Sequence, residues 1–269
     1  MLPRLALLMF ALVPVVACTA EDGTEATSPA PAAATRAGGE SAAAAAADTA
    51  AAAATPALDP AAAEAALAAA ASGTPPVAGT DYVVIPNGEP FEPANGQVEV
   101  VEVFGYTCPH CATFQPLMSA WKAKLPADVR VTYVPAPFGG YWIPYAKAYY
   151  AAESLGVLDE THEAMFRALH LERALPIQNA TPEEIGGWYA EHSDADAEEF
   201  AATMESFGTD AKLKRATQFI QRSGVDGTPS LVVNGKYKVM GRSLPDTLRI
   251  ASHLVAMERA ASEGAAQQP

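Results

Sequence analysis

The chain has 269 residues, of which 50% are hydrophobic and 18% are charged, and its formal net charge is −14. The hydrophobic fraction overstates the core, because alanine supplies 29 of the 61 residues between positions 18 and 78. The remaining residues, about 190 from Gly79 onward, suit one acidic domain without a basic cluster, which excludes nucleic acid as an expected partner. The three cysteines, Cys18, Cys108 and Cys111, are too few for a disulfide scaffold.

Residues 1–17 have the pattern of a secretory signal peptide. Arg4 supplies one positive charge, and an apolar run from Leu5 to Ala17 follows. This run is shorter than the roughly 20 residues of a membrane-spanning helix. The four residues that end in Cys18 resemble the bacterial lipobox, which implies cleavage before Cys18 and a diacylated cysteine that anchors the chain. An ordinary signal peptide that is cut beside a cysteine is the alternative. Thr19 occupies the position where lipoproteins retained in the inner membrane typically have Asp, which favours the outer membrane.

Residues 18–78 form a low-complexity segment rich in Ala, Thr, Pro, Ser and Glu. We expect a tether between the membrane and the domain, because so few large apolar side chains cannot build a core. One part, from Asp59 to Ala71, has an N-cap, a proline at the first helical position and good helix formers. This pattern predicts a short, solvated helix with too little apolar surface to dock strongly on the domain.

The residues with the clearest chemistry lie where a predicted strand gives way to a predicted helix. Residues 98–104 are rich in valine and predict a buried strand, whereas residues 112–124 have apolar side chains at helical spacing. Between them lies Cys108-Pro109-His110-Cys111. The free N–H groups and the dipole of a helix N-terminus favour a thiolate at Cys108.

The other three residues of this tetrad fit the same chemistry. Cys111 lies one helical turn beyond Cys108, within reach for a disulfide, and Pro109 suits the first turn of a helix. His110 adds a positive charge or a hydrogen bond near the sulfur of Cys108. Because each feature stabilises the reduced form, we expect the pair to give its disulfide away.

The tetrad resembles that of the thioredoxin superfamily and, within it, of the DsbA-like periplasmic disulfide oxidases. The resemblance covers roughly residues 80–260 and implies an α/β, thioredoxin-like fold with a helical insertion domain. It also implies a buried acid beneath the active site, for which Glu102 has the matching position and could relay the proton of Cys111. Pro116 matches a helix-kinking proline of the superfamily. Glu99, on the same strand as Glu102, is expected to face outward.

Gly227-Thr228-Pro229-Ser230, about 120 residues after the cysteines, resembles the cis-proline loop of the same superfamily. In that family the loop faces the cysteines and pairs with an extended substrate peptide. We therefore expect a cis Thr228–Pro229 bond, and a trans proline at a strand entry is the alternative. Asn234-Gly235 then predicts a hairpin turn. The best-known DsbA has Val at the position of Thr228, and Thr is common in isomerase relatives, so the redox poise stays open.

The domain is expected to span residues 79–262, with a second strand at 129–135 and a helical insertion at about 139–222. Thr181-Pro182-Glu183-Glu184 is a complete helix start. The aromatic residues between Phe138 and Tyr150 predict core, and some of them a substrate groove. The predicted helices, in chain order, are 145–155, 159–168, 182–192, 196–207, 210–223 and 245–258, and a tail follows at 263–269.

The expected function is thiol:disulfide exchange in the bacterial periplasm, with no cofactor besides the redox-active Cys108–Cys111 pair. The expected partners are reduced or unfolded exported proteins and, by family resemblance alone, a quinone-linked membrane reoxidase similar to DsbB. An isomerase or a reductase of the same superfamily is the alternative. Isomerase relatives usually carry a dimerisation domain, which the alanine-rich segment cannot form.

A non-enzymatic metal-binding or chaperone module is the further alternative. A complete Cys-x-x-Cys pair that does no chemistry in an oxidising compartment argues against it. The chain has no second such pair, and no metal site is predicted. The other histidines are scattered and are expected on the surface or in helix packing: His162, His170, His192 and His253.

Overall fold

The computed structural model describes residues 60–266. The predicted signal peptide, the lipidation of Cys18 and the tether as far as residue 59 lie outside the described residues. Within residues 60–266, no helix is both long and apolar enough to cross a membrane.

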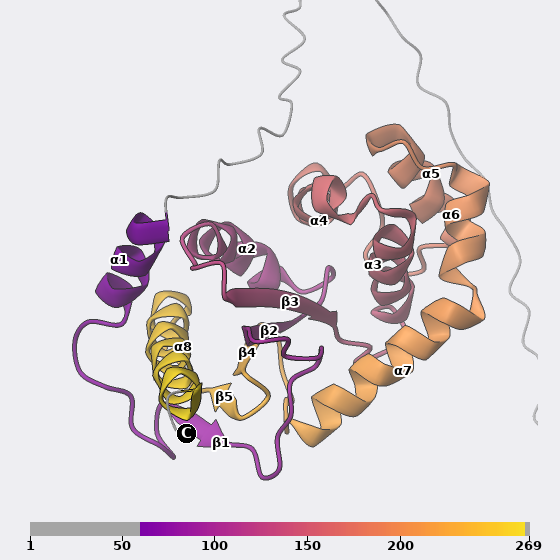
Figure 1. The fold of residues 1–269 in the computed structure, drawn as a ribbon. Helices are drawn as coiled ribbons and strands as arrows, with labels where there is room; N and C mark the ends of the chain where they lie inside the picture. Colours follow the sequence, from indigo (N-terminus) through magenta and orange to yellow (C-terminus); the bar gives the residue numbers. More distant parts are fainter. Residues whose placement is uncertain (1–59, 267–269) are drawn as a thin grey trace, which may run out of the picture. The chain divides into compact units, whose positions relative to one another are not determined.

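A five-stranded sheet forms the centre of the described residues (Figure 1), with the strand order β1-β5-β4-β2-β3. Strands β2 and β3 are parallel, and the other neighbours are antiparallel. The strands predicted at 98–104 and 129–135 have the predicted bounds. The strands are β1 (Tyr82–Val84), β2 (Val98–Phe104), β3 (Val129–Pro135), β4 (Ser230–Val233) and β5 (Tyr237–Val239).

The hairpin between β4 and β5 forms as predicted. Asn234 and Gly235 both have positive φ, at 50° and 66°. The Lys236 N–H donates to the Val233 carbonyl at 2.9 Å, so Asn234 and Gly235 are the central residues of a tight turn, and Asn-Gly accepts positive φ at both positions with little strain.

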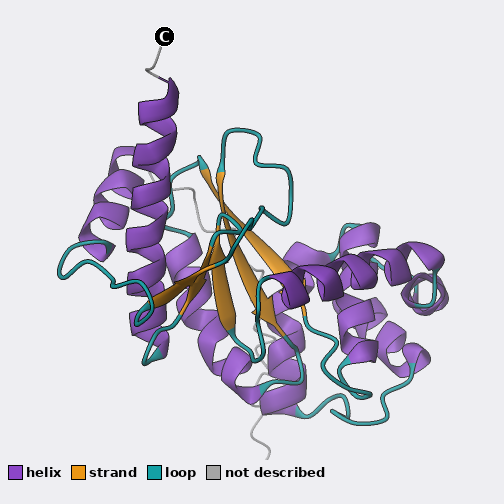
Figure 2. Ribbon diagram, turned by 90° about the horizontal axis from the view of Figure 1, so that it is seen from below, coloured by secondary structure: helices purple, strands orange, loops and turns teal. Residues whose placement is uncertain are grey.

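Helices cover both faces of the sheet, which Figure 2 shows from a second side. On one face, α2 (Pro109–Lys122) and α8 (Leu244–Ala266) pack on Val98 and Val100 of β2. On the other face, Val101 and Val103 pack against the helical insertion. Because β2 lies between two layers, all 7 of its residues are buried.

The helical insertion lies between β3 and β4, as predicted, and its helices lie together in Figure 1. The start of α5 confirms the predicted cap: the Thr181 side chain accepts from the Glu184 N–H, and the Glu184 carboxylate accepts from the Thr181 N–H. The insertion consists of α3 (Ile143–Leu155), α4 (Leu158–Arg167), the π-helical turn η1 (Ala168–Glu172), α5 (Pro182–His192), α6 (Ala197–Met204) and α7 (Phe207–Arg222).

Helix α5 has its predicted bounds, whereas α3, α4, α6 and α7 differ from theirs by one to three residues and α8 extends eight residues further; α6 ends at Met204 rather than at 207. Helix α7 begins at Phe207, because the Ser206 hydroxyl accepts a hydrogen bond from the Thr209 N–H and caps the helix earlier than expected. Helix α8 continues to Ala266, so the tail predicted at 263–269 is wrong for residues 263–266. Alanine and glutamate favour helix there, and no proline interrupts it.

Helix α1 (Pro60–Ala70) confirms the helix predicted in the low-complexity segment, and most of its residues are exposed, but the expectation that it has too little apolar surface to dock is wrong. Ala63 and Leu67 are buried, and Leu67 belongs to the apolar cluster of α2 and α8. Glu64 forms an ion pair with Arg259 of α8, and Arg259 Nε also donates to Asp128 at 2.7 Å. The packed domain therefore includes residues before position 79, and the tether predicted over 18–78 does not extend through α1.

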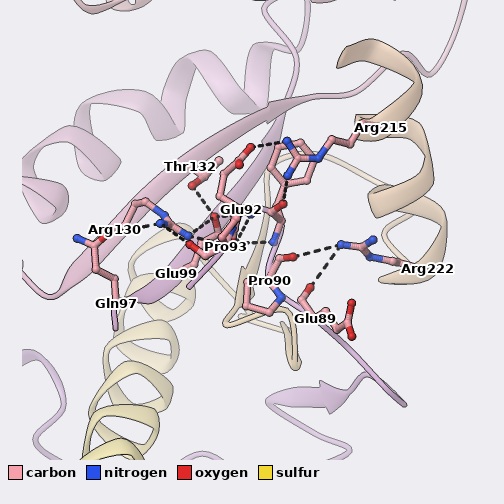
Figure 3. Close-up of polar contacts among 11 residues, drawn as sticks. Glu89, Pro90, Glu92, Pro93, Gln97, Glu99, Arg130, Thr132, Arg215 and Arg222 are labelled. Carbon is pink, nitrogen blue, oxygen red and sulfur yellow. Dashed lines mark hydrogen bonds and ion pairs between the residues drawn. The ribbon is translucent and has the colours of Figure 1, made fainter. Parts of the chain in front are cut away.

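Glu99 is buried, so the prediction that it faces outward is wrong. Figure 3 shows its carboxylate between β3 and the loop that precedes β2. It accepts hydrogen bonds from Thr132 Oγ1 at 2.7 Å, from Arg130 Nη2 at 3.1 Å and from the backbone N–H groups of Phe91 and Glu92. Side chains alternate between the two faces of β2, but neither face meets solvent because helices cover both. A buried carboxylate requires hydrogen-bond partners of this kind.

Two arginines of α7 hold the same loop from its other side (Figure 3). Arg215 pairs with Glu92 at 2.6 Å and also donates to the carbonyl of Phe91. Arg222 donates to the carbonyls of Glu89 and Pro90. The loop thus joins β2 to the last helix of the insertion, from which the chain passes to β4.

Candidate active site

The two cysteines of the tetrad lie where β2 gives way to α2. Cys108 is the N-cap residue, with φ −87° and ψ 116°, and Pro109 is the first helical residue. The Ala112 N–H donates to the Cys108 carbonyl at 3.1 Å and closes the first turn. Both cysteines are free thiols, and Cys108 is 6% exposed whereas Cys111 is 0% exposed. A reacting partner can therefore approach Cys108 but not Cys111.

The pKa of Cys108 is lowered to about 5. The hydrogen bond from Cys111 is the largest cause, the Thr228 side chain and the backbone N–H groups of Cys111 and His110 add to it, and burial opposes it. These N–H groups are free because they belong to the first turn of a helix. Cys108 is therefore a thiolate at neutral pH. The imidazole of His110 is exposed, so this residue acts on the sulfur through its backbone.

The pKa of Cys111 moves in the opposite direction, far above its ordinary value. Burial is the largest cause, and the interactions with Cys108 follow. The reduced pair therefore holds one negative charge and one proton, with the charge on the sulfur that a partner can reach.

Glu102 lies on β2 six residues before Cys108, opposite Tyr133 of β3 and Leu231 of β4. It is fully buried, as predicted, and neither of its carboxylate oxygens has a hydrogen-bond partner among residues 60–266. Burial first, and the charge of Cys108 second, raise the pKa of Glu102 to about 8. Glu102 is therefore protonated at neutral pH and lies close enough to the cysteines to respond to their charge.

The loop before β4 completes the site from the other end of the chain. The Thr228–Pro229 peptide bond is cis, as predicted, and both residues are half-buried. Sγ of Cys108 lies 3.6 Å from the Thr228 carbonyl oxygen, to which the sulfur donates only when it is protonated. The antiparallel pairing of β4 with β2, which begins at Ser230 opposite Val103, sets this approach. Pro116 lies inside α2, where its missing N–H removes one helical hydrogen bond.

Two contacts beside the cysteines, between Gly105 and Trp142 and between Tyr106 and His162, were not predicted. A Cβ atom at Gly105 would lie 2.1 Å from the ring of Trp142, so only glycine lets this indole pack against the segment before Cys108. Tyr106 is buried, and its hydroxyl lies 2.8 Å from Nδ1 of His162. Burial, and then the charge of Lys122, lower the pKa of His162 to about 3, so its ring is neutral. Such contacts leave no local signal, because the partners are 37 to 56 positions apart.

The other expectations for side chains near the site have mixed outcomes. Of the aromatic residues between Phe138 and Tyr150, Tyr145, Tyr149 and Tyr150 are buried, whereas Phe138 and Tyr141 are exposed by about two fifths. Among the described residues, no three His, Cys, Asp or Glu side chains gather in a way that could hold a metal ion.

Comparison with known proteins places this geometry in a family. Residues 99–252 match the family described as the DSBA-like thioredoxin domain. The thiol:disulfide interchange protein DsbA of Pseudomonas aeruginosa is 38% identical over 189 residues, which cover 69% of this chain and 87% of that protein. DsbA of Azotobacter vinelandii is 37% identical over 186 residues, which cover 68% of this chain and 85% of that protein.

Solved structures agree. The crystal structure of the oxidoreductase DsbA from Xylella fastidiosa aligns with a TM-score of 0.68 at 47% identity, covering 70% of this chain and all of that one. The crystal structure of Pseudomonas aeruginosa DsbA aligns with a TM-score of 0.64 at 37% identity, covering 70% of this chain and 97% of that one. The chain therefore belongs to the DSBA-like thioredoxin family, and it is a thiol:disulfide oxidoreductase with the α/β fold and helical insertion that its sequence predicted.

Proposed function

We propose that this oxidoreductase is a periplasmic oxidase that donates the Cys108–Cys111 disulfide to reduced exported proteins, with no other cofactor. The observation that supports the direction is the opposite shift of the two cysteine pKa values. A thiolate that is stabilised at Cys108 stabilises the reduced enzyme, and a pair with a stable reduced form is an oxidant.

The transfer takes two steps. A substrate thiolate attacks Cys108 Sγ of the enzyme disulfide, and the bonding electron pair goes to Cys111 Sγ, which takes up a proton. A second substrate thiolate then attacks the substrate sulfur of the mixed disulfide, and Cys108 leaves as a thiolate. Two electrons pass from the substrate dithiol to the enzyme; of the two substrate protons, the equivalent of one is held on Cys111 and the other enters solvent.

The loop of Thr228 and Pro229 is the proposed binding element for the substrate. It is half-buried, and the Thr228 carbonyl lies beside the reactive sulfur. An extended peptide that pairs with this backbone would bring its cysteine to Cys108.

An isomerase or a reductase is the alternative role for the same chemistry, and Thr228 is the residue that motivates it. The equilibrium of the dithiol with glutathione separates the roles. An oxidase is expected to lie at the strongly oxidising end, whereas a potential near that of thioredoxin would indicate a reductase.

Substitution of each cysteine in turn tests which sulfur is the reactive one. Cys108→Ser is expected to abolish disulfide transfer to reduced, unfolded ribonuclease, measured by recovery of its activity. Cys111→Ser has no disulfide to donate, and its Cys108 thiolate is expected to accumulate mixed disulfides by attacking disulfide-bonded ribonuclease, visible on a non-reducing gel. Cys18→Ser, which removes the cysteine outside the pair, should transfer disulfides like the parent. Full activity of Cys108→Ser would show that another thiol is the donor.

The thiolate at Cys108 should be visible by its ultraviolet absorbance. In the reduced protein we expect a titration with a midpoint near pH 5. Because this pKa is below that of the unfolded chain, the thiolate stabilises the reduced protein fully above about pH 8.5, and the stabilisation decreases as pH falls through 5. Cys111→Ala removes the hydrogen bond that is the largest cause of the low Cys108 pKa, so it should raise the midpoint of the titration. Glu102→Gln should leave it unchanged, because Glu102 is already protonated there. An unshifted midpoint in Cys111→Ala would contradict this origin of the low pKa.

Glu102 is the proposed proton donor to Cys111 when the disulfide opens. The rate of reduction by a small thiol, divided by the thiolate fraction of that thiol, should decrease with rising pH as Glu102, whose pKa burial raises, loses its proton. Glu102→Gln should be reduced about a hundredfold more slowly than the parent and lack this pH dependence. Glu99→Gln, a buried acid on the same strand with other partners, is the matched control and should keep the parental pH profile. A Glu102→Gln profile identical to the parent would refute the role.

The proposed location is the periplasm, with a lipid anchor at Cys18 in the outer membrane and reoxidation by a quinone-linked membrane protein similar to DsbB. The lipobox-like sequence before Cys18 and the residue Thr19 support the anchor. Mass spectrometry of the mature N-terminus should find acylated Cys18. An unmodified start at Thr19 or Ala20 would contradict the anchor without affecting the redox chemistry.

A further inference from the structure

The segment between β2 and the cysteines is held by the helical insertion. Within the described residues, the carbonyl of Tyr106 accepts a single hydrogen bond, from Nε2 of His170 at 2.7 Å. A carbonyl can only accept, so Nε2 of His170 carries the proton. His170 is 64 residues away in the chain and belongs to another layer of the molecule. A side chain of the insertion therefore fixes a peptide group two residues before Cys108.

His170 lies in an unusual backbone conformation within the insertion. It lies in the π-helical turn η1, which follows α4, ends at Glu172 and is followed by Arg173, a residue with φ 56°. The Ala174 N–H closes this turn on the Ala168 carbonyl at 2.9 Å. Turns of this kind are rare and occur frequently at functional sites. Here the turn presents the imidazole to the segment that leads to Cys108.

The Tyr106 peptide group, which His170 holds, affects Cys108 through the position of the first turn of α2. The backbone N–H groups of His110 and Cys111 reach Cys108 Sγ instead of the carbonyls of the preceding segment. Their direction relative to the sulfur depends on the path of Gly105–Thr107, which leaves the sheet after Phe104. The buried Tyr106 ring fixes one end of this path, and the hydrogen bond from His170 fixes its peptide plane.

We propose that His170 is a positioning residue for Cys108: by holding the Tyr106 carbonyl, it sets the geometry in which the N–H groups of α2 stabilise the Cys108 thiolate. This deepens the proposed role of Cys108. Its readouts are thiolate absorbance and the equilibrium with glutathione, so they do not depend on activity toward protein substrates.

Two substitutions that differ by one methylene test the proposal. His170→Gln keeps an N–H donor at a similar reach, whereas the amide of His170→Asn is too short to reach the carbonyl. His170→Asn is expected to raise the Cys108 pKa by about one unit and to move the glutathione equilibrium by about tenfold toward the disulfide. His170→Gln should stay within about twofold of the parent. Because His170 is half-buried, both variants should fold, and His170→Ser repeats the loss if the Asn variant does not.

His192→Asn is the matched control for the same side-chain exchange elsewhere in the insertion. His192 Nδ1 lies 2.7 Å from the Trp188 carbonyl of its own helix, and the two rings stack. This variant should leave the pKa of Cys108 and the glutathione equilibrium unchanged, while thermal unfolding reports its cost to stability. The proposal is overturned if His170→Asn matches the parent, if His170→Gln shifts as much as His170→Asn, or if His192→Asn produces the same shift.

Discussion

The approach of Cys108 to the Thr228 carbonyl is the contact on which the site depends. Its two residues are 120 positions apart, and an entire helical insertion separates them in the chain. The contact exists because β4 pairs antiparallel with β2 and brings both ends of the insertion to the end of one strand. The buried Glu99 and the two arginines of α7 join the same elements from the other end of β2. The sheet, the insertion and the loop before β2 thus together hold Cys108 Sγ close to the Thr228 carbonyl oxygen.

Opposite protonation of the two neighbouring thiols makes the two sulfurs of the site chemically different. The N-terminus of α2 stabilises an anion at Cys108, and burial keeps the proton on Cys111. The same burial keeps Glu102 protonated in an apolar strand, next to a negative charge. One low-dielectric region therefore holds two protons, on Cys111 and Glu102, beneath the single negative charge of Cys108. That distribution suits a reaction in which the outer sulfur accepts a bond and the inner sulfur leaves.

The sequence predicted those features that depend on neighbouring residues. The strand–tetrad–helix order, the capping box at Thr181 and the Asn234-Gly235 turn each have a signal within a few positions, and all three form. The cis bond before Pro229 came from a family motif. The predictions that were wrong concerned residues whose partners lie far away in the chain. Glu99 was expected in solvent because alternation along a strand says nothing about a second covering layer.

The missed contacts have the same physical origin. Helix α1 docks because α8 supplies an apolar surface and Arg259, neither of which is visible in an alanine-rich segment. His170 reads as a scattered histidine until the π-helical turn and the fold place it on the Tyr106 carbonyl. Tertiary partners thus decided the outcome wherever the local pattern was weak or shared by many segments.

The burial of Cys111 has a consequence for which proteins the enzyme can release. Burial, the largest cause of the raised pKa of Cys111, persists in the mixed disulfide and makes the inner thiol a poor nucleophile for expelling the bound chain. The complex then persists until the client supplies a second cysteine. Clients with paired cysteines depart oxidised, whereas a client with a solitary cysteine stays attached and occupies the catalyst. Under the proposed function, an enzyme of this design works best on exported proteins whose cysteines come in even numbers.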